Sequence, residues 1–70
     1  MRVKDCKSEL DIIQAIEGDT LEVETMGDFK KVFAVVYSLK NSQGFYSRLY
    51  RDMKEAMDSG EVEAMLPFSM

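Results

Sequence analysis

The segment from residue 45 to residue 58 constrains the fold most, because a helix would sort its side chains onto two opposite faces. At 100° per residue, the apolar side chains fall within about 140° of arc and the charged side chains occupy the rest. The apolar residues are Phe45, Tyr46, Leu49, Tyr50, Met53, Ala56 and Met57. The spacing predicts an amphipathic helix that is capped by Asn41 or Ser42 and closed by Ser59-Gly60.

The charged face of this predicted helix is balanced. Each of its cations precedes an acid by four residues, in the pairs Arg48–Asp52, Arg51–Glu55 and Lys54–Asp58. Residues four apart are neighbours on a helix, so we expect each pair to cancel its charges. A face that binds nucleic acid would carry cations without interleaved acids, so the pattern disfavours that function.

The turn before this helix, residues 41–44, is a candidate anion site. Free backbone N–H groups at a helix N-terminus can hold a phosphate or a carboxylate, and Lys40, Ser42 and Gly44 are placed to assist. Capping of the helix that follows is an alternative role for the same residues. The second glycine and the Lys-Ser or Lys-Thr pair of a P-loop are absent, so capping is the preferred interpretation.

Another helix is predicted over residues 9–17. Ser8 can cap its start, Glu9 and Asp11 suit the positive end of the helix dipole, and Gly18 can take the left-handed conformation that ends a helix. The apolar residues that share one face are Leu10, Ile12, Ile13 and Ile16.

Two strands are predicted between these helices. Residues 20–25 alternate with period two, and residues 31–39 are dense in β-branched and aromatic side chains. A two-residue turn at Gly27-Asp28 would join the strands as a hairpin. The resulting register would pair Val23 with Val32, Leu21 with Ala34, and Glu24 with Lys31.

The second predicted strand is apolar on both faces, which leaves one row of side chains without a cover. An uncovered apolar row usually marks a contact surface, and the C-terminal tail adds further large apolar residues. The predicted protein interface consists of Phe33, Val35, Tyr37, Leu39, Met65, Leu66 and Phe68. Residues 61–66, a strand at residues 2–4, a second copy of the chain or another protein are the candidate covers, and the sequence does not choose among them.

The patterns predict one small α+β domain over residues 1–70. The expected order is α-β-β-α, with a β-hairpin packed by two helices. A short C-terminal helix or strand follows, and the sequence leaves open which of the two residues 61–66 form.

Catalytic chemistry has little support in the sequence. The chain has no histidine, so Cys6, Ser42 and Ser47 lack the usual partner base, and a zinc site would have one cysteine and carboxylates only. We expect a non-enzymatic protein without a cofactor or a metal ion. The single cysteine and the absence of an apolar leader favour a cytoplasmic setting, and no apolar run is long enough to span a membrane.

Charge is unevenly distributed along the chain, whose formal net charge is -4. Residues 1–28 carry three bases against eight acids, residues 29–54 carry six bases against one acid, and residues 55–70 add four acids. This asymmetry suits oriented docking on another protein or on a second copy of the chain. The negative net charge of the chain disfavours nonspecific binding to DNA or acidic lipid.

In its size, its acidity, its lack of catalytic residues and its excess of apolar surface, the chain resembles the small accessory proteins of phages and mobile elements, including anti-CRISPR inhibitors of host defence. The resemblance implies a protein-binding module that inhibits a host complex. One alternative is a nucleic-acid-binding regulator that uses Lys30, Lys31, Lys40 and Arg48. A further alternative is a bacterial homodimeric structural or assembly subunit.

Overall fold

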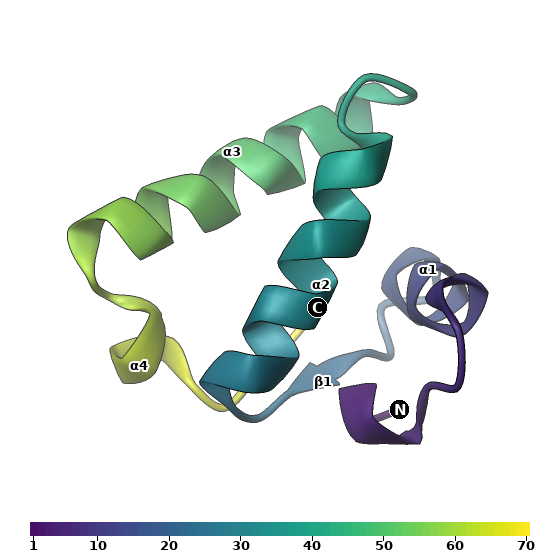
Figure 1. The fold of residues 1–70 in the computed structure, drawn as a ribbon, viewed down its shortest axis with the longest axis horizontal. Coiled ribbons are helices and arrows are strands. Elements are labelled where there is room, and N and C mark those ends of the chain that lie inside the picture. The colour runs from purple at the N-terminus through teal and green to yellow at the C-terminus, as the bar shows by residue number, and fades with distance from the viewer.

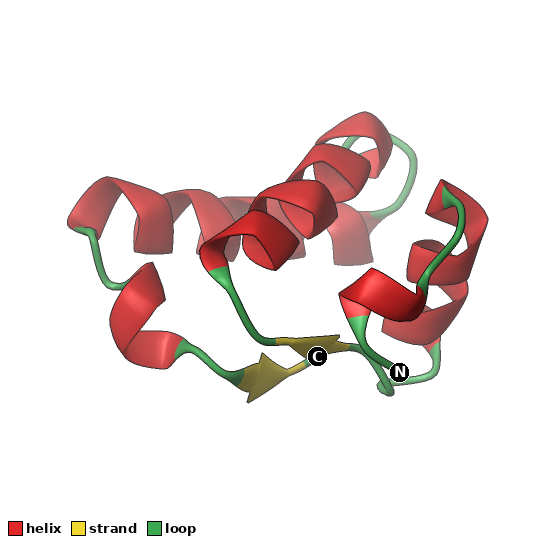
Figure 2. Ribbon diagram, turned by 60° about the horizontal axis from the view of Figure 1, so that its bottom comes forward, coloured by secondary structure: helices red, strands yellow, loops and turns green.

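The computed structural model describes residues 1–70 as four α-helices and a short two-stranded antiparallel sheet, preceded by one 3-10 turn (Figure 1). In chain order the elements are η1 (Val3–Asp5), α1 (Glu9–Glu17), β1 (Glu22–Val23), α2 (Met26–Leu39), α3 (Gly44–Ser59), α4 (Val62–Met65) and β2 (Phe68–Ser69). Figure 2 shows α2 and α3 on one side of the two strands. The chain is therefore α+β, as predicted, but mostly helical. None of its helices has the length and the apolar character that crossing a membrane requires.

The two predicted helices are confirmed. Ser8 is the N-cap of α1 and left-handed Gly60 ends α3, as predicted, whereas the other two helix ends differ. α1 spans residues 9–17, and α3 contains residues 45–58. The N-cap of α3 is Gln43, not Asn41 or Ser42, and its side chain makes no capping hydrogen bond. Gly18 has a φ of -88°, and the left-handed residue is Asp19, with a φ of 54°. Aspartate tolerates this conformation because its short polar side chain can interact locally with the backbone.

The predicted β-hairpin is wrong, because residues 26–39 form the helix α2. Thr25 Oγ1 accepts a hydrogen bond from the backbone N–H of Asp28 (3.1 Å), and Asp28 Oδ2 accepts one from the N–H of Glu24 (3.3 Å). A threonine followed three residues later by an acid is typical of a helix start. Gly27 and Asp28 thus belong to the first turn of a helix instead of a hairpin turn.

Burial explains why this valine-rich segment is helical. Phe29, Val32, Val35 and Val36 are the buried residues of α2, and their spacing of three and four places them on one face. The hydrophobic core holds 13 buried residues, all of them apolar or aromatic. Burial of these four apolar side chains stabilises the helix by more than the low helix propensity of the β-branched valines destabilises it.

The C-terminal tail docks on its own domain and takes the place of the predicted partner strand. β1 pairs with β2 in the register Glu22 with Ser69 and Val23 with Phe68, so the predicted pairs with Val32, Ala34 and Lys31 do not exist. The N–H of Met70 also donates to the carbonyl of Leu21 (2.8 Å). Residues 61–66 contain the short helix α4, and the Leu66–Pro67 peptide bond that follows is cis.

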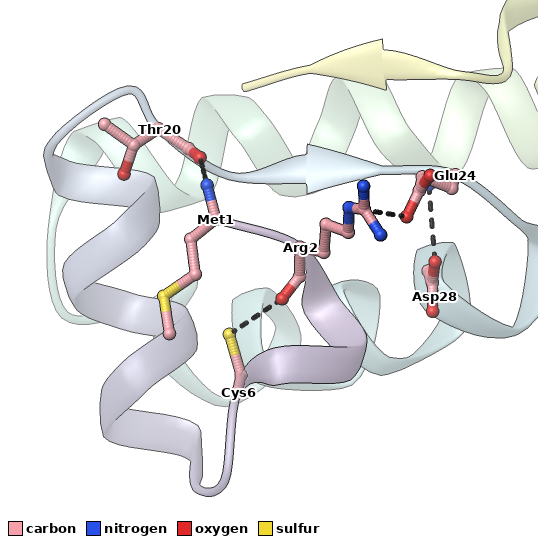
Figure 3. Close-up of polar contacts among 6 residues, drawn as sticks. All are labelled: Met1, Arg2, Cys6, Thr20, Glu24 and Asp28. Atoms are coloured by element: carbon pink, nitrogen blue, oxygen red, sulfur yellow. Dashed lines mark hydrogen bonds and ion pairs between the residues drawn. The ribbon is translucent and has the colours of Figure 1, made fainter.

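The N-terminal segment contributes one bridge to β1 instead of a full strand. Figure 3 shows the Met1 amine donating to the carbonyl of Thr20, and Arg2 beside Glu24. The N–H of Glu22 donates to the Met1 carbonyl (2.7 Å), and Arg2 forms an isolated parallel bridge with Glu22. A strand at residues 2–4, one of the candidate covers, is therefore not formed, and this bridge and η1 occupy its place.

Gly27→Ala distinguishes the helix from the predicted hairpin by the sign of its effect on stability. A Cβ at Gly27 would lie 3.8 Å from Thr25 Oγ1, an ordinary contact, and alanine restricts the unfolded chain. The free energy of unfolding is expected to rise by about 0.5–1 kcal/mol. A hairpin turn with positive φ would instead lose stability. Urea denaturation measures the change. Gly60→Ala is the control, because Gly60 has a φ of 73° and alanine is strained in that conformation. This variant should lower the free energy of unfolding by about 1 kcal/mol.

Candidate functional site

The predicted row of Phe33, Val35, Tyr37 and Leu39 does not form one surface. A spacing of two residues turns about 200° around a helix, so the row splits between two faces of α2. Phe33 and Tyr37 pack on Tyr50 of α3, with ring centroids 5.4 Å and 5.7 Å apart. Val35 is buried in the core, and Leu39 is half-buried against it.

An apolar groove of about 330 Å³ lies between α3 and the C-terminal segment. One wall consists of Phe45, Leu49 and Met53, which α3 presents on one side of its wide apolar arc. Met65 of α4, together with Phe68 and Met70, lines it from the C-terminal segment. Two residues of the predicted tail interface, Met65 and Phe68, therefore lie in one concave site. Leu66 instead packs half-buried against the core.

The floor of the groove is the hydrophobic core itself. Ile16 of α1 and Phe29 of α2 line the groove and are otherwise buried. Phe68 meets Phe29 edge to face, with centroids 6.3 Å apart. At the rim, Phe45 is 54% exposed and Met65 is 41% exposed. The groove thus combines a buried apolar floor with two large apolar side chains that are open to solvent.

A second, acidic hollow adjoins the groove. Asp52 and Met65 line both, and the hollow is completed by Glu55, Ala56, Ser59 and Glu61. It therefore has three carboxylates and no basic side chain. Asp19 adds another carboxylate to the groove. Carboxylates without interleaved cations create a negative potential that favours a basic ligand next to the apolar surface.

The predicted anion-site residues lie at the turn before α3. Ser42 and Gly44 are exposed there. The Lys40 ammonium lies 5.2 Å from the ring centroid of Tyr37 and 5.4 Å from that of Tyr50. Lys40 is therefore engaged by aromatic rings of α2 and α3.

The expected ion pairs on α3 do not form. The only ion pair in the structure joins Arg2 Nε to Glu24 Oε1 at 3.8 Å. Exposed pairs gain little energy against the entropy of holding two long side chains together. The residues of the nucleic-acid hypothesis are also dispersed: Lys31 and Lys40 line different hollows, and Lys30 and Arg48 line neither of them.

The titratable groups with shifted pKa values are a thiol and a phenol. Burial, followed by the charges of Asp11 and Asp5, raises the pKa of Cys6, whose thiol donates to the Arg2 carbonyl (3.6 Å, Figure 3). Burial and the neighbouring Glu17 raise the pKa of Tyr46. A raised thiol pKa keeps the sulfur protonated and weakly nucleophilic. No group of three histidine, cysteine or acidic side chains is arranged to hold a metal ion.

Sequence reasoning identified Phe45, Leu49 and Met53 as one apolar face but did not identify the groove that they line. The signal in the sequence was the width of that arc, since one neighbouring helix covers only part of it. No protein-family model, no curated protein and no solved structure matches the chain.

Proposed function

We propose that this chain is a small, non-enzymatic protein-binding module whose groove between α3 and the C-terminal segment holds an apolar segment of another protein. The observation that carries the proposal is the concave apolar site with exposed Phe45 and Met65 on its rim and buried Phe29 as its floor. Concave apolar surfaces flanked by polar groups are the usual docking sites for amphipathic peptide segments.

The acidic hollow beside the groove indicates the chemistry of the partner. Asp52, Glu55 and Glu61 would face the continuation of any segment that extends past Met65. We therefore expect the bound segment to carry two or more large apolar side chains next to lysine or arginine. Matching charges would raise the association rate and fix the orientation of the segment, while apolar burial would supply most of the affinity.

Inhibition of a host defence complex is the proposed biological role, in line with the resemblance to small phage and mobile-element proteins. The support for this role is the general character of the chain, which is small and acidic and has an apolar groove at its surface. The groove supports the narrower proposal of protein binding more directly. The protein-binding proposal therefore stands even if the inhibitory role fails.

Selection from a displayed peptide library tests the binding proposal and defines the sequence that the groove prefers. Peptides enriched on the wild-type protein are expected to share large apolar residues flanked by lysine or arginine. The same peptides should be lost on the double variant Phe45→Ser, Met65→Ser and retained on Leu10→Ser, which removes an exposed apolar side chain from α1, outside the groove. Failure to enrich any peptide, or retention on the double variant, would contradict the proposal.

A further inference from the structure

A basic hollow of about 300 Å³ lies where the end of α2 meets α3, apart from the apolar groove. Its lining residues are Lys40, Asn41, Ser47, Tyr50, Arg51 and Lys54. Half of them are cations and none is an acid, although acids outnumber bases in the chain by 13 to 9. The four residues from α3 are spaced by three and four, which places them on one face of that helix.

Lys40 is held in position by two aromatic rings. Its ammonium lies 5.2 Å from the Tyr37 centroid and 5.4 Å from the Tyr50 centroid, within the range of cation–π attraction. A cation that is fixed before a ligand arrives loses less conformational entropy on binding. The rings thus preorganise one positive charge at the edge of the hollow.

Arg51 and Lys54 are not paired with the acidic residues of α3. Neither forms an ion pair with the acid one turn later, Glu55 or Asp58. Glu55 instead lines the acidic hollow beside the apolar groove. The guanidinium and the ammonium therefore remain open to a ligand in the basic hollow.

We propose that this hollow binds a phosphomonoester. The guanidinium of Arg51 can donate two parallel hydrogen bonds to phosphate oxygens, Lys40 and Lys54 supply point charges, and Ser47 and Asn41 supply neutral donors. A compact dianion fits this arrangement, because the three cations line a single hollow of about 300 Å³. The site does not depend on the proposed protein-binding groove.

Titration with inorganic phosphate, followed by amide chemical shifts at constant ionic strength, tests this site. Saturable shifts are expected around residues 40–41 and 47–54. Arg51→Gln should weaken binding about tenfold or more, as expected for loss of a charge-assisted hydrogen bond. Lys31→Gln, which removes an exposed cation from another part of α2, should change the affinity by less than about twofold, because a distant exposed charge is largely screened.

Three further probes identify the source of the phosphate. A phosphoserine peptide and adenosine monophosphate present the same group on a protein and on a nucleotide. The probe that binds with the higher affinity identifies the source of the phosphate. Oligothymidylate presents phosphodiesters, and tighter binding of this probe than of both monoesters would overturn the proposal. Absence of saturable shifts, or equal losses in Arg51→Gln and Lys31→Gln, would also overturn it.

Discussion

Phe29→Ala is expected to remove most of the free energy of unfolding of this protein. The Phe29 side chain is fully buried, and its replacement leaves a cavity where α2, β2 and the floor of the groove meet. Truncating a buried phenylalanine costs about 3–5 kcal/mol. A chain of this length has a total stability of about 4–10 kcal/mol, so the variant should unfold at far lower urea concentration.

Urea denaturation followed by circular dichroism measures this loss. Leu10→Ala is the matched control, because Leu10 is 59% exposed on α1. The control should change the free energy of unfolding by no more than about 0.5 kcal/mol. A similarly small change for Phe29→Ala would contradict the packing described for α2 and the C-terminal segment.

Loss of partner binding in Phe45→Ser and Met65→Ser is the second large expected effect. Both side chains stand at the rim of the groove and would become buried by a docked segment. Anchor residues at an interface cost about 2 kcal/mol or more when truncated, which corresponds to a loss of about 30-fold in affinity for each variant. Their partial exposure in the free protein means that the free energy of unfolding should change little.

Calorimetric titration with a peptide selected on the wild-type protein measures these affinities. Leu10→Ser should bind as the wild type does. Tyr37→Ser tests the interface that the sequence predicted on residues 33–39, since Tyr37 is exposed on α2 and lies outside the groove. If Tyr37→Ser abolishes binding while the two groove variants retain it, the binding surface lies on α2 around Tyr37 and the groove proposal is wrong.

The contrast between residues 45–58 and residues 31–39 shows which elements of this fold the sequence could predict. Charged residues break the first segment into a clear 3.6-residue pattern, so its helix is identified from spacing alone. The second segment is a nearly continuous apolar run, in which periods of 2 and 3.6 fit equally well. Its valines and aromatics then favoured a strand. The decisive local signal was Thr25 followed by Asp28, whose side chains form the N-terminal cap of α2.

The candidate site was only partly predictable for a different reason. The excess of apolar residues in the tail indicated that Met65 and Phe68 would belong to a contact surface, and both residues line the groove. The groove itself depends on β2 pairing with β1, a contact between segments far apart in sequence, and on the position that α4 takes after α3. The basic hollow was missed because i, i+4 spacing was taken to neutralise Arg51 and Lys54, whose side chains do not pair with those acids.

The six methionines allow the most direct measurement of the central claim, which is that the groove is the docking site. Met53, Met65 and Met70 line the groove, whereas Met1, Met26 and Met57 do not. With isotope-labelled methionine methyl groups, titration of a selected peptide should shift the first three NMR signals and leave the other three nearly unchanged. Shifts confined to Met1, Met26 and Met57 would contradict the account.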